Sequence, residues 1–139
     1  MEVLFESNEQ WHKGVVKSYK GIVDVVELDG TLYDLKSFKH YTIDDVFSDW
    51  MLIYWSREDG CETIRVLKDG IEFHFKASIN YDLYSGVDDI SQEKTIEINR
   101  FDVSNLKYLP YDNREGVDIT ATDEIKRHIY NAAFEKEQN

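Results

Sequence analysis

The sequence predicts an α+β domain, with a mostly antiparallel, twisted sheet of about six or seven strands, a short helix and a C-terminal helix packed on one face. Three observations support this class. Residues 71–81 alternate apolar and polar side chains, which places one set on each face of a strand. Asp-Gly pairs, typical of tight hairpin turns, separate several apolar runs. Near the C-terminus, apolar residues recur at helical spacing.

Length and composition indicate one domain spanning residues 1–139. The single cysteine, Cys61, has no partner for an internal disulfide, so no oxidising compartment is indicated. The longest apolar run, residues 50–55, falls far below the roughly 20 residues of a membrane span. The first residues do not resemble a signal peptide, since Glu2 and Glu6 are acidic. We therefore expect a cytoplasmic protein.

The N-terminal part is expected to contain short strands joined by turns. Residues 7–13 are polar and are expected to form a loop. Residues 14–28 are rich in valine and predict one bent strand or two, with a bend or bulge at Gly21. Asp29-Gly30 predicts a hairpin, and its returning strand is expected at 31–35.

A short helix near residues 43–49 is expected next, because Thr42 can cap it and acids follow in its first turn. Three strands should then form an antiparallel meander, with turns at residues 57–60 and 68–70. The expected strands are residues 51–56, 61–67 and 71–81.

The rest of the chain predicts a loop at 83–92 and a strand at 93–101. Residues 102–116 contain apolar positions, but Pro110 and its neighbours are expected to prevent a regular element. A C-terminal helix is predicted near residues 121–136. Its apolar stripe consists of Ile125, Ile129, Ala132 and Ala133.

Negative charge is the strongest compositional feature. The formal net charge is −12, and it is divided equally between residues 1–70 and 71–139, each with 14 acids and 8 bases. Nucleic-acid phosphates would be repelled, which argues against direct DNA or RNA binding and favours either a basic protein partner or a role in solubility alone. Nineteen aromatic residues, nine of them tyrosines, are consistent with a β-rich core or with an interaction surface.

Candidate catalytic groups are few. Glu72, His74 and Lys76 would stand in a row on the outer face of the long strand, which could provide an acid–base pair or half of a metal site. The four histidines lack metal-ligand spacing, and no glycine-rich phosphate loop is present. We expect a non-enzymatic protein without metal or cofactor, and a solvated polar face at these three residues.

Three groups of surface residues are the candidate partner-binding sites. Two are acidic clusters without the ligand pattern of a calcium loop, and the third lies on the outer face of the long strand. The candidates are Asp44, Asp45 and Asp49; Asp88 and Asp89; and Glu72 with His74.

Residues 71–139 resemble a class of small acidic proteins encoded by phages and mobile elements, mostly of unassigned function. The resemblance is carried by residues 71–75, 95–98 and 116–120, with Glu124-Ile125 following. It implies no catalytic residues, and it implies a phage-encoded accessory protein.

The leading functional hypothesis is a protein-binding inhibitor whose acidic, aromatic-bearing surface blocks a basic, nucleic-acid-binding site on a host or defence protein. A bacterial toxin-immunity protein would bind in the same way. A self-associating structural or assembly component is the alternative from another class. A small enzyme using Glu72, His74 and Lys76 is the least favoured. An oligomer is possible: a monomer would favour an inhibitor, and a stable oligomer would favour a structural role. No membrane partner is expected.

Overall fold

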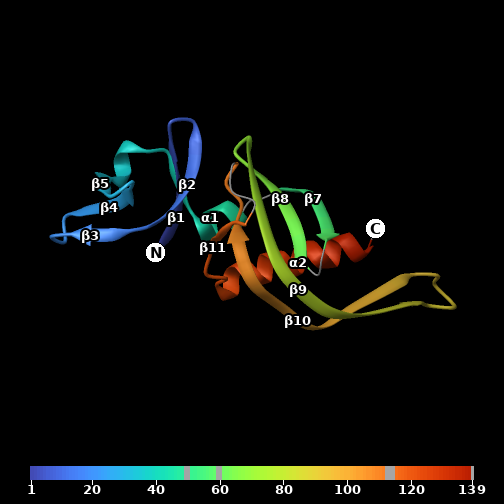
Figure 1. Ribbon diagram of the computed structural model, residues 1–139. Helices are drawn as coiled ribbons and strands as arrows, with labels where there is room; N and C mark the ends of the chain where they lie inside the picture. The colour runs from blue at the N-terminus through green and yellow to red at the C-terminus, as the bar shows by residue number, and fades with distance from the viewer. Residues whose placement is uncertain (49–50, 59–60, 112–114, 139) are drawn as a thin grey trace.

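The computed structural model describes residues 1–48, 51–58, 61–111 and 115–138 (Figure 1). The chain is α+β, as predicted, with eleven strands and two α-helices among these residues. Every strand pairing is antiparallel. The strands are divided among three sheets, whereas we expected them to share one.

The first 42 residues, which we call the minor unit, form two three-stranded sheets that pack around a minor core. The chain passes from one sheet to the other at Val16, between β2 and β3. The buried residues of the minor core are Val3, Phe5, Val26 and Leu35. One sheet contains β2 (Gln10–Val15), β1 (Glu2–Ser7) and β6 (His40–Thr42), and the other contains β3 (Lys17–Tyr19), β4 (Val23–Leu28) and β5 (Thr31–Asp34). A 3-10 turn, η1 (Leu35–Ser37), connects β5 to β6.

The predicted loop at residues 7–13 is wrong, because β2 begins at Gln10. A two-residue turn at Asn8 and Glu9 joins β1 to β2, and both residues have positive φ, at 52° and 64°. Tight hairpin turns of this kind usually carry glycine, and this turn has none, so the hairpin was not predicted from the residues. The expected hairpin at Asp29-Gly30 is confirmed, with φ of 51° and 81°. Gly21 lies in the turn between two strands.

The remaining strands form a five-stranded sheet in the order β11-β10-β9-β8-β7. The two helices contact each other, and α2 packs against β10 on one face of this sheet, as predicted (Figure 1). The strands are β7 (Met51–Glu58), β8 (Cys61–Lys68), β9 (Ile71–Val87), β10 (Lys94–Tyr108) and β11 (Val117–Asp118). The helices are α1 (Ile43–Ser48) and α2 (Asp123–Gln138).

The major core lies between this sheet and the helices. Phe73, Phe75, Ala77 and Ile79 of β9 are all buried, which confirms the alternation in the sequence. From α2, the predicted stripe of Ile125, Ile129, Ala132 and Ala133 is buried too.

Strand β1 joins the two cores, because its successive side chains point in opposite directions. Leu4 is buried in the major core, whereas Val3 and Phe5 are buried in the minor core. Tyr41 of β6 adds a link from the minor unit, since its hydroxyl donates to Asp69 at 2.9 Å.

Strands β9 and β10 are longer than we expected. The predicted loop at 83–92 is wrong for residues 83–87, which continue β9. The predicted break at 102–116 is wrong for residues 102–108, which continue β10. Two bulges explain the irregular pattern of β10: the register shifts between Asn99 and Asp102 and between Ser104 and Lys107. Each bulge moves the inward-facing positions by one residue.

Neither helix in the described part of the chain is long and apolar enough to cross a membrane.

Candidate partner-binding arm

The structure places the predicted site residues in three separate regions. Asp44 and Asp45 lie in the first turn of α1, Glu72 and His74 lie on the outer face of β9, and Asp88 and Asp89 lie at the tip of the β9–β10 hairpin. Asp49 lies outside the described residues. Among the predicted site residues that the structure describes, Glu72 and His74 are in direct contact through a hydrogen bond.

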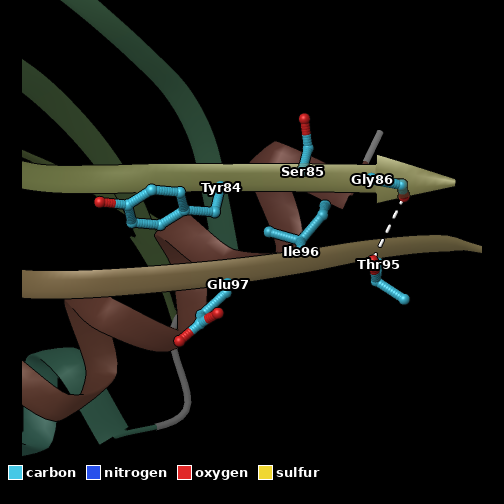
Figure 2. Close-up of a pocket in the computed structure, with 6 residues that line it drawn as sticks. All are labelled: Tyr84, Ser85, Gly86, Thr95, Ile96 and Glu97. Carbon is cyan, nitrogen blue, oxygen red and sulfur yellow. Dashed lines mark hydrogen bonds between the residues drawn. The ribbon is translucent and has the colours of Figure 1, made fainter.

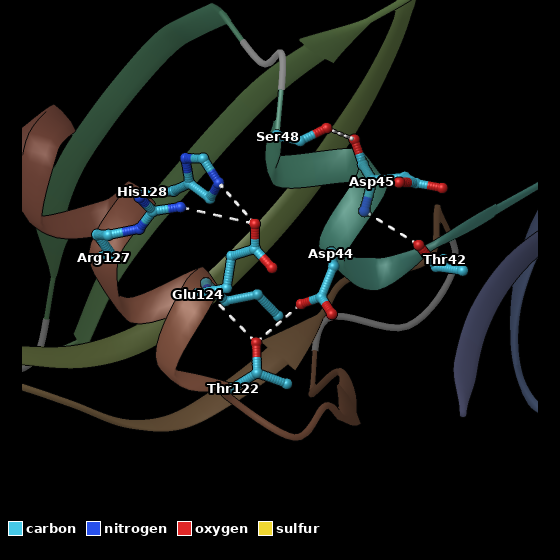
Figure 3. Close-up of polar contacts among 9 residues, drawn as sticks. Thr42, Asp44, Asp45, Ser48, Thr122, Glu124, Arg127 and His128 are labelled. Atoms are coloured by element: carbon cyan, nitrogen blue, oxygen red, sulfur yellow. Dashed lines mark hydrogen bonds and ion pairs between the residues drawn. The ribbon is translucent and has the colours of Figure 1, made fainter.

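Asp44 of α1 belongs to a contact between the two helices (Figure 3). Thr122 donates its hydroxyl to Asp44 Oδ1 at 2.8 Å and accepts the backbone N–H of Ile125 at 3.2 Å. Thr42 accepts the backbone N–H of Asp45 at 3.1 Å, which confirms the predicted cap. Asp44 is therefore half-buried in a contact that fixes α1 against the start of α2.

On α2 itself, Glu124 faces two basic side chains, which Figure 3 also shows. Its Oε1 lies 3.6 Å from Arg127 and 3.9 Å from His128. These contacts lie within one helix, and they do not contribute to a site with the acids of α1.

The outer face of the five-stranded sheet carries charges of both signs. Glu72 Oε1 lies 2.9 Å from His74 Nε2 and 3.9 Å from Arg65 Nε. Lys76 pairs in register with Lys107, whose side chain lies 3.4 Å from Asp118. These charged side chains therefore form no net negative patch around Glu72 and His74.

The Glu72–His74 contact could support acid–base chemistry, but its setting is open. The two side chains are 43% and 41% exposed. No group of three or more histidine, cysteine, aspartate or glutamate side chains could hold a metal ion among the residues that the structure describes.

The third region is a two-stranded ribbon that we call the arm, residues 82–99. It is the end of the β9–β10 hairpin beyond the first bulge, and Figure 1 shows it running past the covered part of the sheet. Bulges bend the strand that carries them, so the bulge after Asn99 marks the boundary between the arm and the body of the sheet. The connection at the tip is short, because β9 ends at Val87 and β10 begins at Lys94.

One face of the arm is apolar. Residues paired across the ribbon share a face, and Leu83 pairs with Ile98 while Ser85 pairs with Ile96. Leu83 and Val87 are exposed, and Ile90 at the tip is 97% exposed. The last turn of α2 touches this side of the arm, where Lys94 Nζ donates to the Glu137 carbonyl at 3.1 Å.

The opposite face is polar and aromatic. Tyr84 pairs across the ribbon with Glu97, and Gly86 pairs with Thr95. These four residues, with Ser85 and Ile96, line an open hollow of about 390 Å³ (Figure 2). Tyr84 is 58% exposed. Gly86, on the same face, has no side chain and leaves the surface open there.

The tip is held by Asp88. Its Oδ1 accepts the backbone N–H groups of Ile90 at 2.8 Å and of Ser91 at 2.9 Å. The hydrogen bond from Ser91, followed by that from Ile90, lowers the pKa of the Asp88 carboxyl, with desolvation opposing them. Asp88 therefore stays charged and gives the tip a defined shape, while Asp89 beside it is exposed.

The sequence indicated the acids of the tip and the strand that carries Ile96 and Ile98, but Leu83 and Val87 were assigned to a loop. The signal was present, because Leu83 and Val87 continue the odd-numbered apolar positions of β9. Gly86 and the adjacent aspartates concealed it, since they are typical of a loop. Comparisons with protein-family models, with curated proteins and with solved structures find no match for this chain.

Proposed function

We propose that this chain is a non-enzymatic binding protein that presents the arm to a basic surface of another protein. The observation that carries this proposal is the arm itself, a ribbon that projects from the body with exposed apolar side chains and a concentration of acids. Two-stranded ribbons are marginally stable when uncovered, and exposed apolar residues gathered in one place are typical of interaction sites.

Charge supports a basic partner. Residues 82–99 contain five acids and one base, so the arm has a net charge of −4. The acids are Asp82, Asp88, Asp89, Glu93 and Glu97, and the base is Lys94. A projecting element of one sign steers a partner of the opposite sign and speeds association at low salt.

The setting that fits this chemistry best is inhibition. A phage-encoded protein of this kind would block a basic, nucleic-acid-binding site on a host or defence protein, and it would act in the cytoplasm of the host cell. A toxin-immunity protein would use the same contacts against a basic toxin. Neither setting involves direct binding to nucleic acid or to a membrane, because the acidic body is repelled by phosphates.

Self-association is the second candidate, and the exposed apolar face of the arm favours it. Leu83 and Val87 of two copies could pack together and remove apolar surface from water. Against this, each copy has a net charge of −12 and each arm a net charge of −4, so two copies repel each other. Size-exclusion chromatography at low and high salt separates the candidates: a monomer at both favours a heterologous partner, and a salt-promoted dimer favours self-association.

The test of the proposed function uses three versions of the protein as baits in a host lysate. One is the wild type, and one carries Asp88→Asn, Asp89→Asn and Glu93→Gln in the arm. Asparagine at 88 keeps the acceptor that holds the tip. The third is a control with the same change in total charge at exposed positions of the minor unit, Glu9→Gln, Asp24→Asn and Asp29→Asn.

We expect the wild type and the control to capture the same protein with a basic nucleic-acid-binding surface. The arm variant should fail to capture this protein, and added nucleic acid should displace the captured protein from the wild-type bait. Retention of the partner should fall between about 0.05 and 0.5 M salt, because surface charges are screened over this range. Capture that is equal for all three baits, or independent of salt, contradicts the proposal.

A further inference from the structure

We infer that the hollow on the polar face of the arm is a subsite for an arginine side chain of the partner. This inference rests on the proposed function, and it names the chemistry that the arm recognises. Three features line the hollow: an exposed aromatic ring, a carboxylate on the facing strand, and a glycine on the same face. A guanidinium group is planar, positively charged and a hydrogen-bond donor, so it can stack on the ring, donate to the carboxylate and occupy the space at the glycine.

The ring is Tyr84, which points away from Gly86 toward the body in Figure 2. Directly opposed residues of an antiparallel ribbon have Cβ atoms about 4.5–5.5 Å apart, so the side chains of Tyr84 and Glu97 leave neighbouring backbone positions on the same face. A planar guanidinium can stack on the ring and donate to the Glu97 carboxylate at the same time. Lysine offers a point charge without a plane, so it satisfies one of the two contacts less well.

The carboxylate is oriented by its neighbour. Asn99 Nδ2 donates to Glu97 Oε1 at 3.1 Å, which draws the side chain along the strand. This bond uses one acceptor of Oε1, and a carboxylate offers about four acceptor positions. The Tyr84–Glu97 face can therefore receive a donor without breaking the contact to Asn99.

Gly86 leaves the hollow open because it has no side chain, and a larger residue at this position would fill the hollow. A Cβ placed at Gly86 would meet only Thr95 Oγ1, at 3.6 Å, which is an ordinary van der Waals contact. The backbone at Gly86 is not in the left-handed region, and β-branched residues suit a strand. Gly86→Val should therefore fold normally and fill the hollow.

The experiment measures the binding of hexa-arginine and hexa-lysine peptides, which carry equal charge, to five versions of the full chain. These are the wild type, Gly86→Val, Tyr84→Leu and two controls. Glu93→Gln removes one charge from the arm outside the hollow. Ser78→Val places the same new side chain on the outer face of β9 within the body.

We expect the wild type to bind hexa-arginine about threefold more tightly than hexa-lysine. Gly86→Val and Tyr84→Leu should reduce this ratio to about one. Glu93→Gln should weaken both peptides equally and leave the ratio unchanged, and Ser78→Val should change neither peptide.

Three outcomes overturn the inference. Equal binding of the two peptides to the wild type, or a preference that Gly86→Val leaves intact, shows that the hollow does not read arginine, while binding to the acidic arm stands. Failure of both peptides to bind contradicts the subsite and the proposed function together.

Discussion

The β9–β10 hairpin has two halves that share the same strands and differ in what covers them. In the body half, α2 packs on the sheet, and the inward side chains of β9 are buried from Phe73 to Ile79. In the arm, the same face carries Leu83 and Val87, and both are exposed. The pattern of alternation hardly changes along β9, so alternation alone does not determine burial.

The difference lies in the helix. α2 ends at Gln138, and its last turn reaches the root of the arm, where the Tyr81 hydroxyl donates to Glu137 Oε1 at 2.7 Å. Within the arm, Ile98 is still buried and Lys94 reaches the Glu137 carbonyl, whereas Leu83 and Val87 on the same face are exposed. A strand that extends past its covering helix leaves part of its core-like face exposed, and this exposed face is the basis of the proposed interface.

The largest expected difference between the halves is in packing. Phe75 is fully buried between Phe47 and Tyr108, with ring centroids 4.8 and 5.6 Å away. Phe75→Ala should lower the free energy of unfolding by about 3–5 kcal/mol. Val87→Ala in the arm should change it by less than about 0.5 kcal/mol, because the side chain is exposed. Urea denaturation measures both, and equal losses would contradict the distinction between body and arm.

A smaller contrast comes from one substitution made in each half. Thr122→Val removes the hydroxyl that caps α2 and bonds Asp44, so we expect a loss of about 1–2 kcal/mol in unfolding free energy. Thr95→Val removes an exposed 3.3 Å bond to the Gly86 carbonyl in the arm, and the loss should stay below about 0.5 kcal/mol. Chemical denaturation again decides, and a cost at Thr95 as large as that at Thr122 would show that the arm is held rigidly.

High pH should weaken the body through a buried tyrosine. Burial raises the pKa of Tyr108 from 10.0 to about 12. The unfolded chain therefore releases this proton first, so the contribution is present below pH 10 and is lost as pH rises toward about 12. Burial, followed by the contact with Asp69, also raises the pKa of Tyr41.

The Tyr108→Phe variant isolates this effect. Its stability should fall less steeply between pH 10 and about 12 than that of the wild type, as measured by denaturation at each pH. Parallel curves for the two proteins would contradict the assignment.

The smallest effect is expected at His74, which precedes Phe75 but faces outward. His74→Ala should change the unfolding free energy by less than about 0.5 kcal/mol and should leave partner binding intact. Full biological activity of this variant removes the hypothesis of an enzyme that uses Glu72, His74 and Lys76. Loss of activity with unchanged folding and binding would support that hypothesis.

Local patterns predicted the elements in which apolar residues repeat with a single, uninterrupted period. Ile71 to Tyr81 alternates without interruption, and α2 shows an undisturbed helical stripe, so both were found from the residues alone. β10 was found only up to Phe101, because bulges with positive φ at Arg100 and Asn105 shift its inward positions twice. The buried positions of β10, which include Ile98, Val103 and Leu106, therefore follow no single period in the sequence.

The division into three sheets could not be predicted, because it depends on which strands pair over long distances. β1 pairs with β6, some 35 residues further along the chain, and no local feature of either strand specifies this. The candidate site was predicted in part. Asp88 and Asp89 were identified, but the role of Asp44 within the fold and the apolar face around Leu83 required the structure.

The most direct test of the central claim removes the arm and retains the body. Residues 84–97 are replaced by Asn-Gly, so that a tight turn joins the Leu83–Ile98 pair. We expect the armless protein to unfold with a free energy within about 1 kcal/mol of the wild type, since the removed residues are mostly exposed, and to lose partner capture completely. A folded, armless protein that still captures the same partner would contradict the account.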